Sequence, residues 1–139
     1  MNIKEKKSLN KKEEMIMEVL WSQPEPVTIT ELEELFADKK ISKASIFKTV
    51  QALVKKEYVR ISGMELVKKT YARKLEPAIN REEYAAILLM ERGITRSSLG
   101  EIAIAMTGSD RNGRKNKKED EKLIKELEEI IARLREQDK

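Results

Sequence analysis

Cysteine and histidine are both absent from the 139 residues, and their absence excludes whole classes of chemistry. Without cysteine the chain has no disulfide, no thiolate metal site and no cysteine nucleophile. Without histidine it has no imidazole ligand and no side chain that ordinarily titrates near neutral pH. An enzyme built on carboxylates or lysines would lack the commonest general acid–base residue. We therefore expect no catalytic residues, no metal and no cofactor.

Aromatic residues and long apolar runs are also scarce. Aromatics make up 4% of the chain. The longest apolar run, Ala85–Met90, is far shorter than the roughly 20 residues of a membrane-spanning helix. The first ten residues are basic, but no apolar stretch follows them, so they do not resemble a signal peptide. Because hydrophobic residues still reach 40%, we expect a folded cytoplasmic protein with one domain, or a small domain with an appendage.

The formal net charge of +4 conceals a strong asymmetry along the chain. Residues 1–12 carry +4, and residues 13–38 carry eight acids and no base, a charge of −8. Residues 39–74 carry eleven bases and two acids, a charge of +9, while residues 75–139 are nearly neutral at −1. The +9 segment is a candidate surface for a polyanion such as nucleic acid, although most lysine-rich surfaces bind nothing.

Capping signals and apolar spacing predict two helices at the start of the chain. The first begins near Asn10, with Glu13 at the capping-box spacing, and ends at about Ser22 before two prolines. The second is predicted to be capped by Thr30, with Glu33 again at the capping-box position. Its buried face is predicted to hold Leu32, Leu35 and Phe36.

A third helix is predicted from a Ser42 cap to about Lys56. Its apolar stripe follows helical spacing and comprises Ile46, Val50, Leu53 and Val54. The opposite side is basic at Lys48 and Lys55 and otherwise small or polar. Phe47 lies on the flank, where it is either a residue at the edge of the core or an apolar contact to a thymine methyl group.

Short β-branched segments predict three strands. Val27–Ile29 is a candidate edge strand, and Tyr58–Met64 and Leu66–Arg73 are candidate partners in a hairpin. The turn signal Ser62–Gly63 is predicted to end the first of these two strands. Leu75–Ile79 is predicted to be a linker that closes the compact unit.

The rest of the chain is predicted to be helical. Asn80 caps a fourth helix that stops at Gly93, and a short fifth helix spans about Ser97–Met106. The polar, glycine-bearing segment Thr107–Lys118 is predicted to be a mobile loop. A final amphipathic helix covers about Glu119–Glu136.

This order of elements is that of a winged helix-turn-helix. The predicted fold is mainly α with a small β-hairpin wing: a winged-helix DNA-binding domain in residues 1–76 and a helical dimerisation region in residues 77–139. In this motif the third helix enters the DNA major groove, and its N-terminus favours anions. Its predicted contacts are Ser42, Lys43, Ala44, Ser45, Lys48, Gln51 and Lys55, and those of the hairpin are Lys68, Lys69 and Arg73.

Three segments resemble the penicillinase repressor (BlaI/MecI/CopY) family. They are Glu14–Trp21, Val27–Leu32 and Ser42–Lys56, which stand in the family's order with similar spacing. The resemblance implies a homodimeric transcriptional repressor that binds a pseudo-palindromic double-stranded operator. By position it places Ser42, Lys43, Ala44, Ser45 and Lys48 on the operator, and makes Arg60, Lys68, Lys69 and Arg73 wing or backbone contacts.

The sequence departs from that family pattern in three ways. Phe47-Lys48 stands where family members often have Lys-Thr, which leaves the operator sequence open. The Asn-Phe dipeptide at which family repressors are typically cleaved is absent, and so are the tail cysteines of the copper-responsive branch. Ile41–Ser45 is also similar to the recognition helix of ferric-uptake-type repressors, but those need histidine and cysteine ligands. A regulatory protease or ligand is therefore left unidentified.

The final predicted helix carries more large aliphatic residues than a lone surface helix should expose. It either folds back on the winged helix or packs against a second subunit, and the resemblance favours the second subunit. A twofold dimer would place two recognition helices about 34 Å apart. The predicted dimer contacts are Ile87, Leu88, Leu99, Ile102, Leu123, Leu127, Ile130, Ile131 and Leu134.

Two other functions compete with the repressor. One is a winged-helix adaptor that contacts only proteins. The other is a small carboxylate enzyme, which the scattered acids and the lack of a glycine-rich phosphate loop disfavour.

Overall fold

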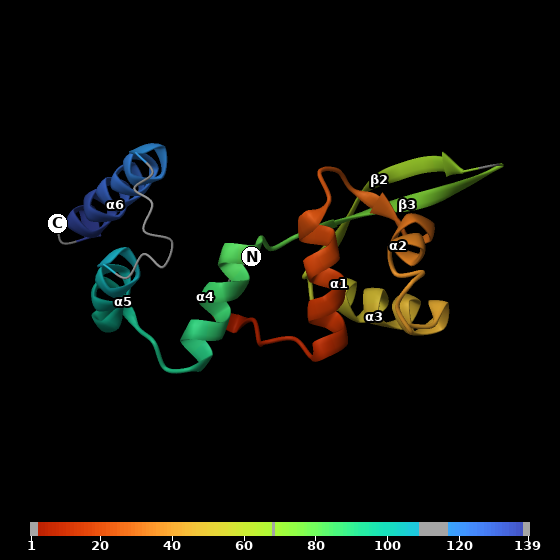
Figure 1. Cartoon of the computed structure of the whole chain (residues 1–139), viewed down its shortest axis with the longest axis horizontal. Coiled ribbons are helices and arrows are strands. Elements are labelled where there is room, and N and C mark those ends of the chain that lie inside the picture. The colour runs from red at the N-terminus through yellow and green to blue at the C-terminus, as the bar shows by residue number, and fades with distance from the viewer. Residues whose placement is uncertain (1–2, 68, 109–116, 138–139) are drawn as a thin grey trace. The chain divides into compact units, whose positions relative to one another are not determined.

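A computed structural model describes residues 3–67, 69–108 and 117–137, and their contacts divide the chain into two units (Figure 1). The units are Met1–Thr95 and Arg96–Lys139. The first unit contains the elements η1 (Ile3–Glu5), α1 (Lys11–Ser22), β1 (Val27–Thr28), α2 (Ile29–Leu35), α3 (Lys43–Lys55), β2 (Val59–Val67), β3 (Thr70–Pro77) and α4 (Arg81–Glu91). The second contains α5 (Arg96–Gly108) and α6 (Lys117–Gln137). This is the predicted winged helix with a helical C-terminal region.

Three of the predicted helix caps, Asn10, Ser42 and Asn80, are confirmed, and one lies elsewhere. Asn10 with Glu13 and Asn80 with Glu83 both form complete capping boxes. The second helix is capped by Thr28, whose hydroxyl accepts the Glu31 N–H at 3.2 Å, and not by Thr30. The helix therefore starts two residues early, and Ile29 belongs to it instead of to the strand before it.

The sheet has the strand order β1-β3-β2, and its hairpin is longer than predicted. The signal at Ser62–Gly63 does not end β2, which continues to Val67. Ser62 is instead absorbed in a bulge, because Ile61 pairs with Leu75 while Gly63 pairs with the next residue of β3, Lys74. Residues 75–77 of the predicted linker lie in β3, where they pair with β1 or β2.

The core of the first unit lies between the helices and one face of the sheet. The helices contribute most of it, and β1 and the base of the hairpin contribute Val27, Val59 and Leu75. Ile79, Tyr84 and Ile87 belong to the same cluster, so α4 packs on the winged helix. The first unit consequently extends to Thr95, beyond the boundary at residue 76 that the sequence predicts.

Two tyrosines tie the N-terminal segment to the helices. The Tyr84 hydroxyl accepts the Leu9 N–H at 2.9 Å and donates to the Glu14 carboxylate. The Tyr58 hydroxyl donates to the Lys7 carbonyl at 2.6 Å. Burial raises the pKa of Tyr58 to about 12, and burial with the Glu14 hydrogen bond raises the pKa of Tyr84 as well. Both hydroxyls therefore keep their protons, and their role as donors, at neutral pH.

Ile87 is a correction to the predicted dimer surface. Its side chain is 1% exposed in the core of the first unit, which leaves it no surface for a partner, and Leu88 packs partly against the same core. The helical spacing of these residues predicts an apolar face, but it does not say which partner covers that face.

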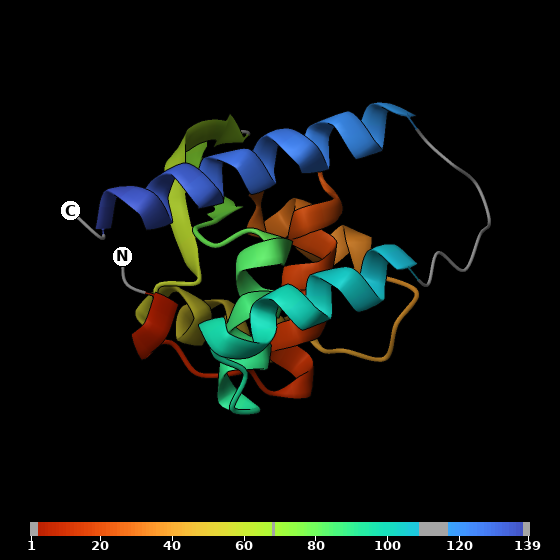
Figure 2. The same cartoon turned by 90° about the vertical axis from the view of Figure 1, so that its left-hand side faces the viewer.

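The second unit consists of two helices with no buried side chain among their described residues. Figure 2 shows α6 as one uninterrupted helix. The predicted loop is shorter than expected at both ends, since Thr107 and Gly108 lie in α5 and Lys117 and Lys118 in α6. Residues 109–116 of that prediction lie outside the described residues. No helix in the described ranges is long and apolar enough to span a membrane.

We expect Tyr84→Phe to lower the free energy of unfolding by about 1–2 kcal/mol, because the buried Leu9 N–H then loses the hydroxyl that accepts its hydrogen bond. Tyr71→Phe removes a hydroxyl from a side chain that is 68% exposed and should change stability by less than about 0.5 kcal/mol. Urea denaturation of both variants tests this. Equal losses would contradict a structural role for the Tyr84 hydroxyl.

Candidate nucleic-acid interface

The N-terminus of α3 is built from small and cationic residues. The Ser42 hydroxyl accepts the Ser45 N–H at 3.1 Å and caps the helix, while Lys43 and Ala44 are exposed in its first turn. Free backbone N–H groups and the helix dipole favour an anion at such an end. Small side chains allow a phosphate or base edge to approach closely.

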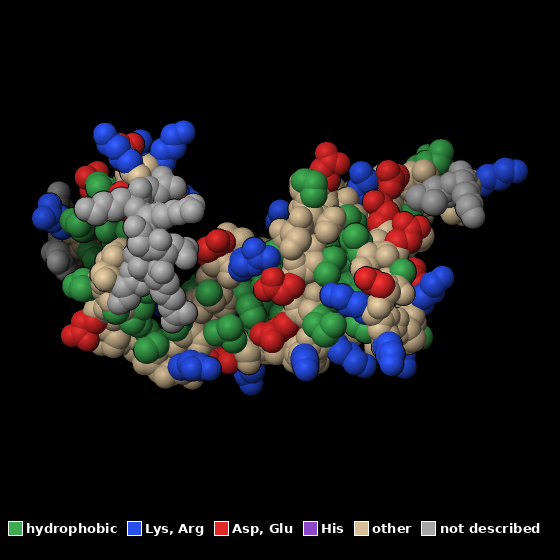
Figure 3. Space-filling model, in the orientation of Figure 1, with side chains coloured by type: hydrophobic (Ala, Val, Ile, Leu, Met, Phe, Trp, Pro, Cys, Tyr) green, Lys and Arg blue, Asp and Glu red, His purple; other side chains and the backbone are tan. Residues whose placement is uncertain are grey.

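Lys12 of α1 also reaches the N-terminus of α3, although no sequence pattern indicates it. Its ammonium donates to the Ser45 hydroxyl at 3.2 Å from α1. The two residues are 33 positions apart, so no local pattern joins them. The only signal was the +4 charge of residues 1–12. Figure 3 shows Lys and Arg side chains gathered below α1 and α3 in this view.

The predicted outer face of α3 is exposed as a continuous polar side. Lys48, Gln51 and Lys55 are exposed, while Ile46, Val50 and Leu53 on the opposite side are buried. Phe47 is 52% exposed and lies on the side of α3 toward the hairpin, so it is not a core residue. Among the described residues, no carboxylate lies within ion-pair distance of Lys43, Lys48 or Lys55.

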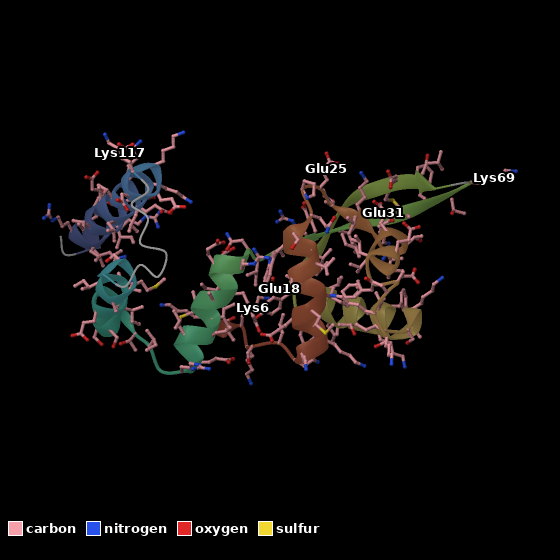
Figure 4. All side chains as sticks on the ribbon, viewed as in Figure 1. Lys6, Glu18, Glu25, Glu31, Lys69 and Lys117 are labelled. Carbon is pink, nitrogen blue, oxygen red and sulfur yellow. The ribbon has the colours of Figure 1, made fainter. Side chains whose placement is uncertain are left out.

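The hairpin presents its cations unevenly. Lys69 lies exposed at the outer end (Figure 4), and Arg73 is exposed on β3. Arg60 lies at the base of the hairpin, where its Nε contacts the Glu76 carboxylate at 2.7 Å across the strand pair. Lys68 lies outside the described residues. The hairpin therefore brings Lys69 and Arg73 to its outer half but not Arg60.

Several acids of the −8 segment are held by caps and ion pairs in the interior and along α1. The Glu13 carboxylate is 2% exposed; it accepts the Asn10 N–H at 3.0 Å and the Lys56 ammonium at 2.7 Å. Glu18 contacts Arg81 at 2.9 Å, and the Glu31 carboxylate accepts the Thr28 N–H in the capping box of α2. These contacts involve none of the exposed lysines of α3, which therefore keep a positive field. Nowhere in the described ranges do three acidic side chains converge to hold a metal ion.

Known proteins give two kinds of match. The family model of the penicillinase repressor matches residues 9–133. Among solved structures, Staphylococcus aureus MarR in complex with salicylate and kanamycin is 17% identical, with 92% of this chain and 75% of that chain covered and a TM-score of 0.42. A MarR protein from Peptoclostridium difficile is 21% identical, with 91% and 71% covered and a TM-score of 0.43. No curated protein matches the chain in sequence.

The different settings of Lys48 and Arg60 give a prediction. Lys48→Gln should weaken binding to double-stranded DNA by about threefold to fivefold, since an exposed cation with no described acidic partner is lost. Arg60→Gln should have a smaller effect, because Glu76 already neutralises that guanidinium. Fluorescence anisotropy with a labelled duplex compares them, and a larger loss for Arg60→Gln would contradict the assignment.

Proposed function

The chain belongs to the penicillinase repressor family, and from this premise we propose that it is a homodimeric repressor that inserts α3 into the major groove of a two-half-site operator. The observation that carries the proposal is the outer face of α3. It combines a capped, anion-favouring N-terminus with the exposed side chains of Lys43, Lys48 and Lys55, all on the third helix of a winged-helix domain.

Each part of this surface has a distinct role in the proposal. Contacts from Lys43, Lys48, Lys55 and Lys69 to phosphates supply most of the affinity and fix the register. Ser42, Ala44, Ser45 and Gln51 lie where base edges are read, and they supply sequence preference. Arg73 adds a cation beside α3 from the hairpin.

The proposed dimer rests on an exposed aliphatic stripe along α6. Its aliphatic side chains are Leu123, Ile124, Leu127, Ile130, Ile131 and Leu134, and by helical geometry they share one side. Five of the six are 39–52% exposed, and none is buried. Covering this stripe against a second copy removes it from water, and twofold dimers are the commonest oligomers. Leu99 and Ile102 of α5 extend the proposed contact.

The DNA-binding half is tested by salt dependence. The logarithm of duplex affinity should fall with the logarithm of salt concentration, with a slope of about −0.9 per neutralised phosphate. The double variant Lys43→Ala/Lys48→Ala should reduce that slope by about 2 units. Arg92→Ala, which removes an exposed charge at the C-cap of α4, should leave it unchanged.

Absence of binding to any duplex at low salt would instead favour a winged-helix adaptor that contacts only proteins. Binding with no difference between the double variant and Arg92→Ala would place the DNA on another surface.

The dimer half is tested by Leu127→Asp, which places a carboxylate in the centre of the stripe. We expect monomers by analytical ultracentrifugation and weakened operator binding, because only one recognition helix then engages per molecule. Ala132→Asp adds the same charge about 140° away from Leu127 around the helix and should stay dimeric. A Leu127→Asp variant that remained dimeric would refute the α6 interface.

A further inference from the structure

A groove of about 470 Å³ lies between α3 and the hairpin. Phe47, Gln51, Val54 and Lys55 line it from α3, and Ile61 and Arg73 line it from the strands. Val50 and Leu75 of the core close its floor. Its size falls within the range of about 300–1,000 Å³ that is typical of small-molecule sites.

Apolar surface dominates the walls of this groove. Phe47 is 52% exposed and Ile61 is 42% exposed, so both side chains keep large apolar areas in water. A ligand that covered them would gain the free energy of removing that area from solvent. A phosphate or sugar alone would not, because it has little apolar surface to pair with these residues.

Two cations and no acid accompany the apolar walls. Lys55 lines the groove from the helix and Arg73 from the strand, and no carboxylate is among the lining residues. Neither cation has an ion-pair partner in the part of the chain that the structure describes. Gln51 adds an amide able to donate or accept. The complementary occupant has a flat apolar body and one negative charge.

We propose that this groove binds a small aromatic carboxylate and that its occupation releases the operator. The ring packs against Phe47, Val54 and Ile61, and the carboxylate is held by Lys55 and Arg73. The second half rests on the proposed function, because Gln51, Lys55 and Arg73 are also proposed to contact DNA. A bound carboxylate pairs with both cations, halves their net charge and covers the amide, so the ligand and the operator exclude one another.

The binding half is tested on the full chain without DNA. Titration with 1-naphthoate, followed by amide chemical shifts, should perturb Phe47, Val54, Ile61 and Arg73. The isosteric but uncharged 1-naphthamide should bind at least about threefold more weakly, since it lacks the charge that the cations recognise. Shifts confined to α5 and α6 would overturn the proposal.

Variants of Lys55 and Arg73 in the groove, compared with one of Lys48 outside it, distinguish ligand binding in the groove from general charge attraction. Lys55→Gln and Arg73→Gln should each weaken 1-naphthoate binding by about threefold, an effect of the size expected for one exposed ion pair. Lys48→Gln should weaken duplex binding but leave 1-naphthoate binding unchanged, because Lys48 does not line the groove. Equal effects of all three on 1-naphthoate would indicate general charge attraction and overturn the site.

Competition decides the regulatory half. 1-Naphthoate should displace a labelled duplex from the unsubstituted chain, and 1-naphthamide should not do so at the same concentration. Displacement by both compounds, or by neither while 1-naphthoate occupies the groove, would overturn release by an anion. If 1-naphthoate bound the groove and no duplex bound at any salt concentration, the repressor would fail and the ligand site would stand.

Discussion

The buried carboxylate of Glu13 holds α3 in place. A charge at 2% exposure is costly unless it is fully paired, and here one oxygen accepts the Asn10 N–H while the other accepts the Lys56 ammonium just beyond the end of α3. At the other end of the helix, Lys12 reaches from α1 to the Ser45 hydroxyl. Both ends of α3 are thus fastened to α1, and these contacts act together with the buried Ile46, Val50 and Leu53 to keep the opposite side of α3 facing outward.

Local sequence rules predicted those features that depend on neighbouring residues. The boxes at Asn10 and Asn80 follow from a three-residue spacing alone. Thr28 and Thr30 both have a glutamate three residues later, so local spacing does not choose between them. Pairing of Thr28 with Lys74 in the sheet makes that choice, and it is a contact across the fold. The turn signal at Ser62–Gly63 was overridden in the same way, by cross-strand pairing that continues past it.

In the candidate site too, local periodicity predicts some features, while others depend on contacts between residues far apart in the sequence. The exposed side of α3 follows from helical periodicity, and Lys48, Gln51 and Lys55 lie where the sequence predicts. Pairing of Arg60 with Glu76, and the approach of Lys12 to Ser45, involve residues 16 and 33 positions apart, so no helical or strand period reveals them. The groove beside Phe47 also needed the hairpin to be placed, since its two walls come from separate elements.

The bulge at Ser62 controls the phase of the strand beyond it. In a regular strand Ile61 would share a face of the sheet with Glu65. Because of the extra residue, Ile61 instead shares a face with Met64 and Leu66. The cross-strand partners of these three residues are Leu75, Arg73 and Tyr71. Glu65 is thereby directed to the face opposite Arg73. Loss of Ser62 would regularise the ladder and keep every pair beyond it. Loss of Met64, Glu65 or Leu66 would instead shift the rest of β2 by one position against β3. The hairpin therefore tolerates a change of length at one point, and elsewhere the same change would move side chains to the wrong face.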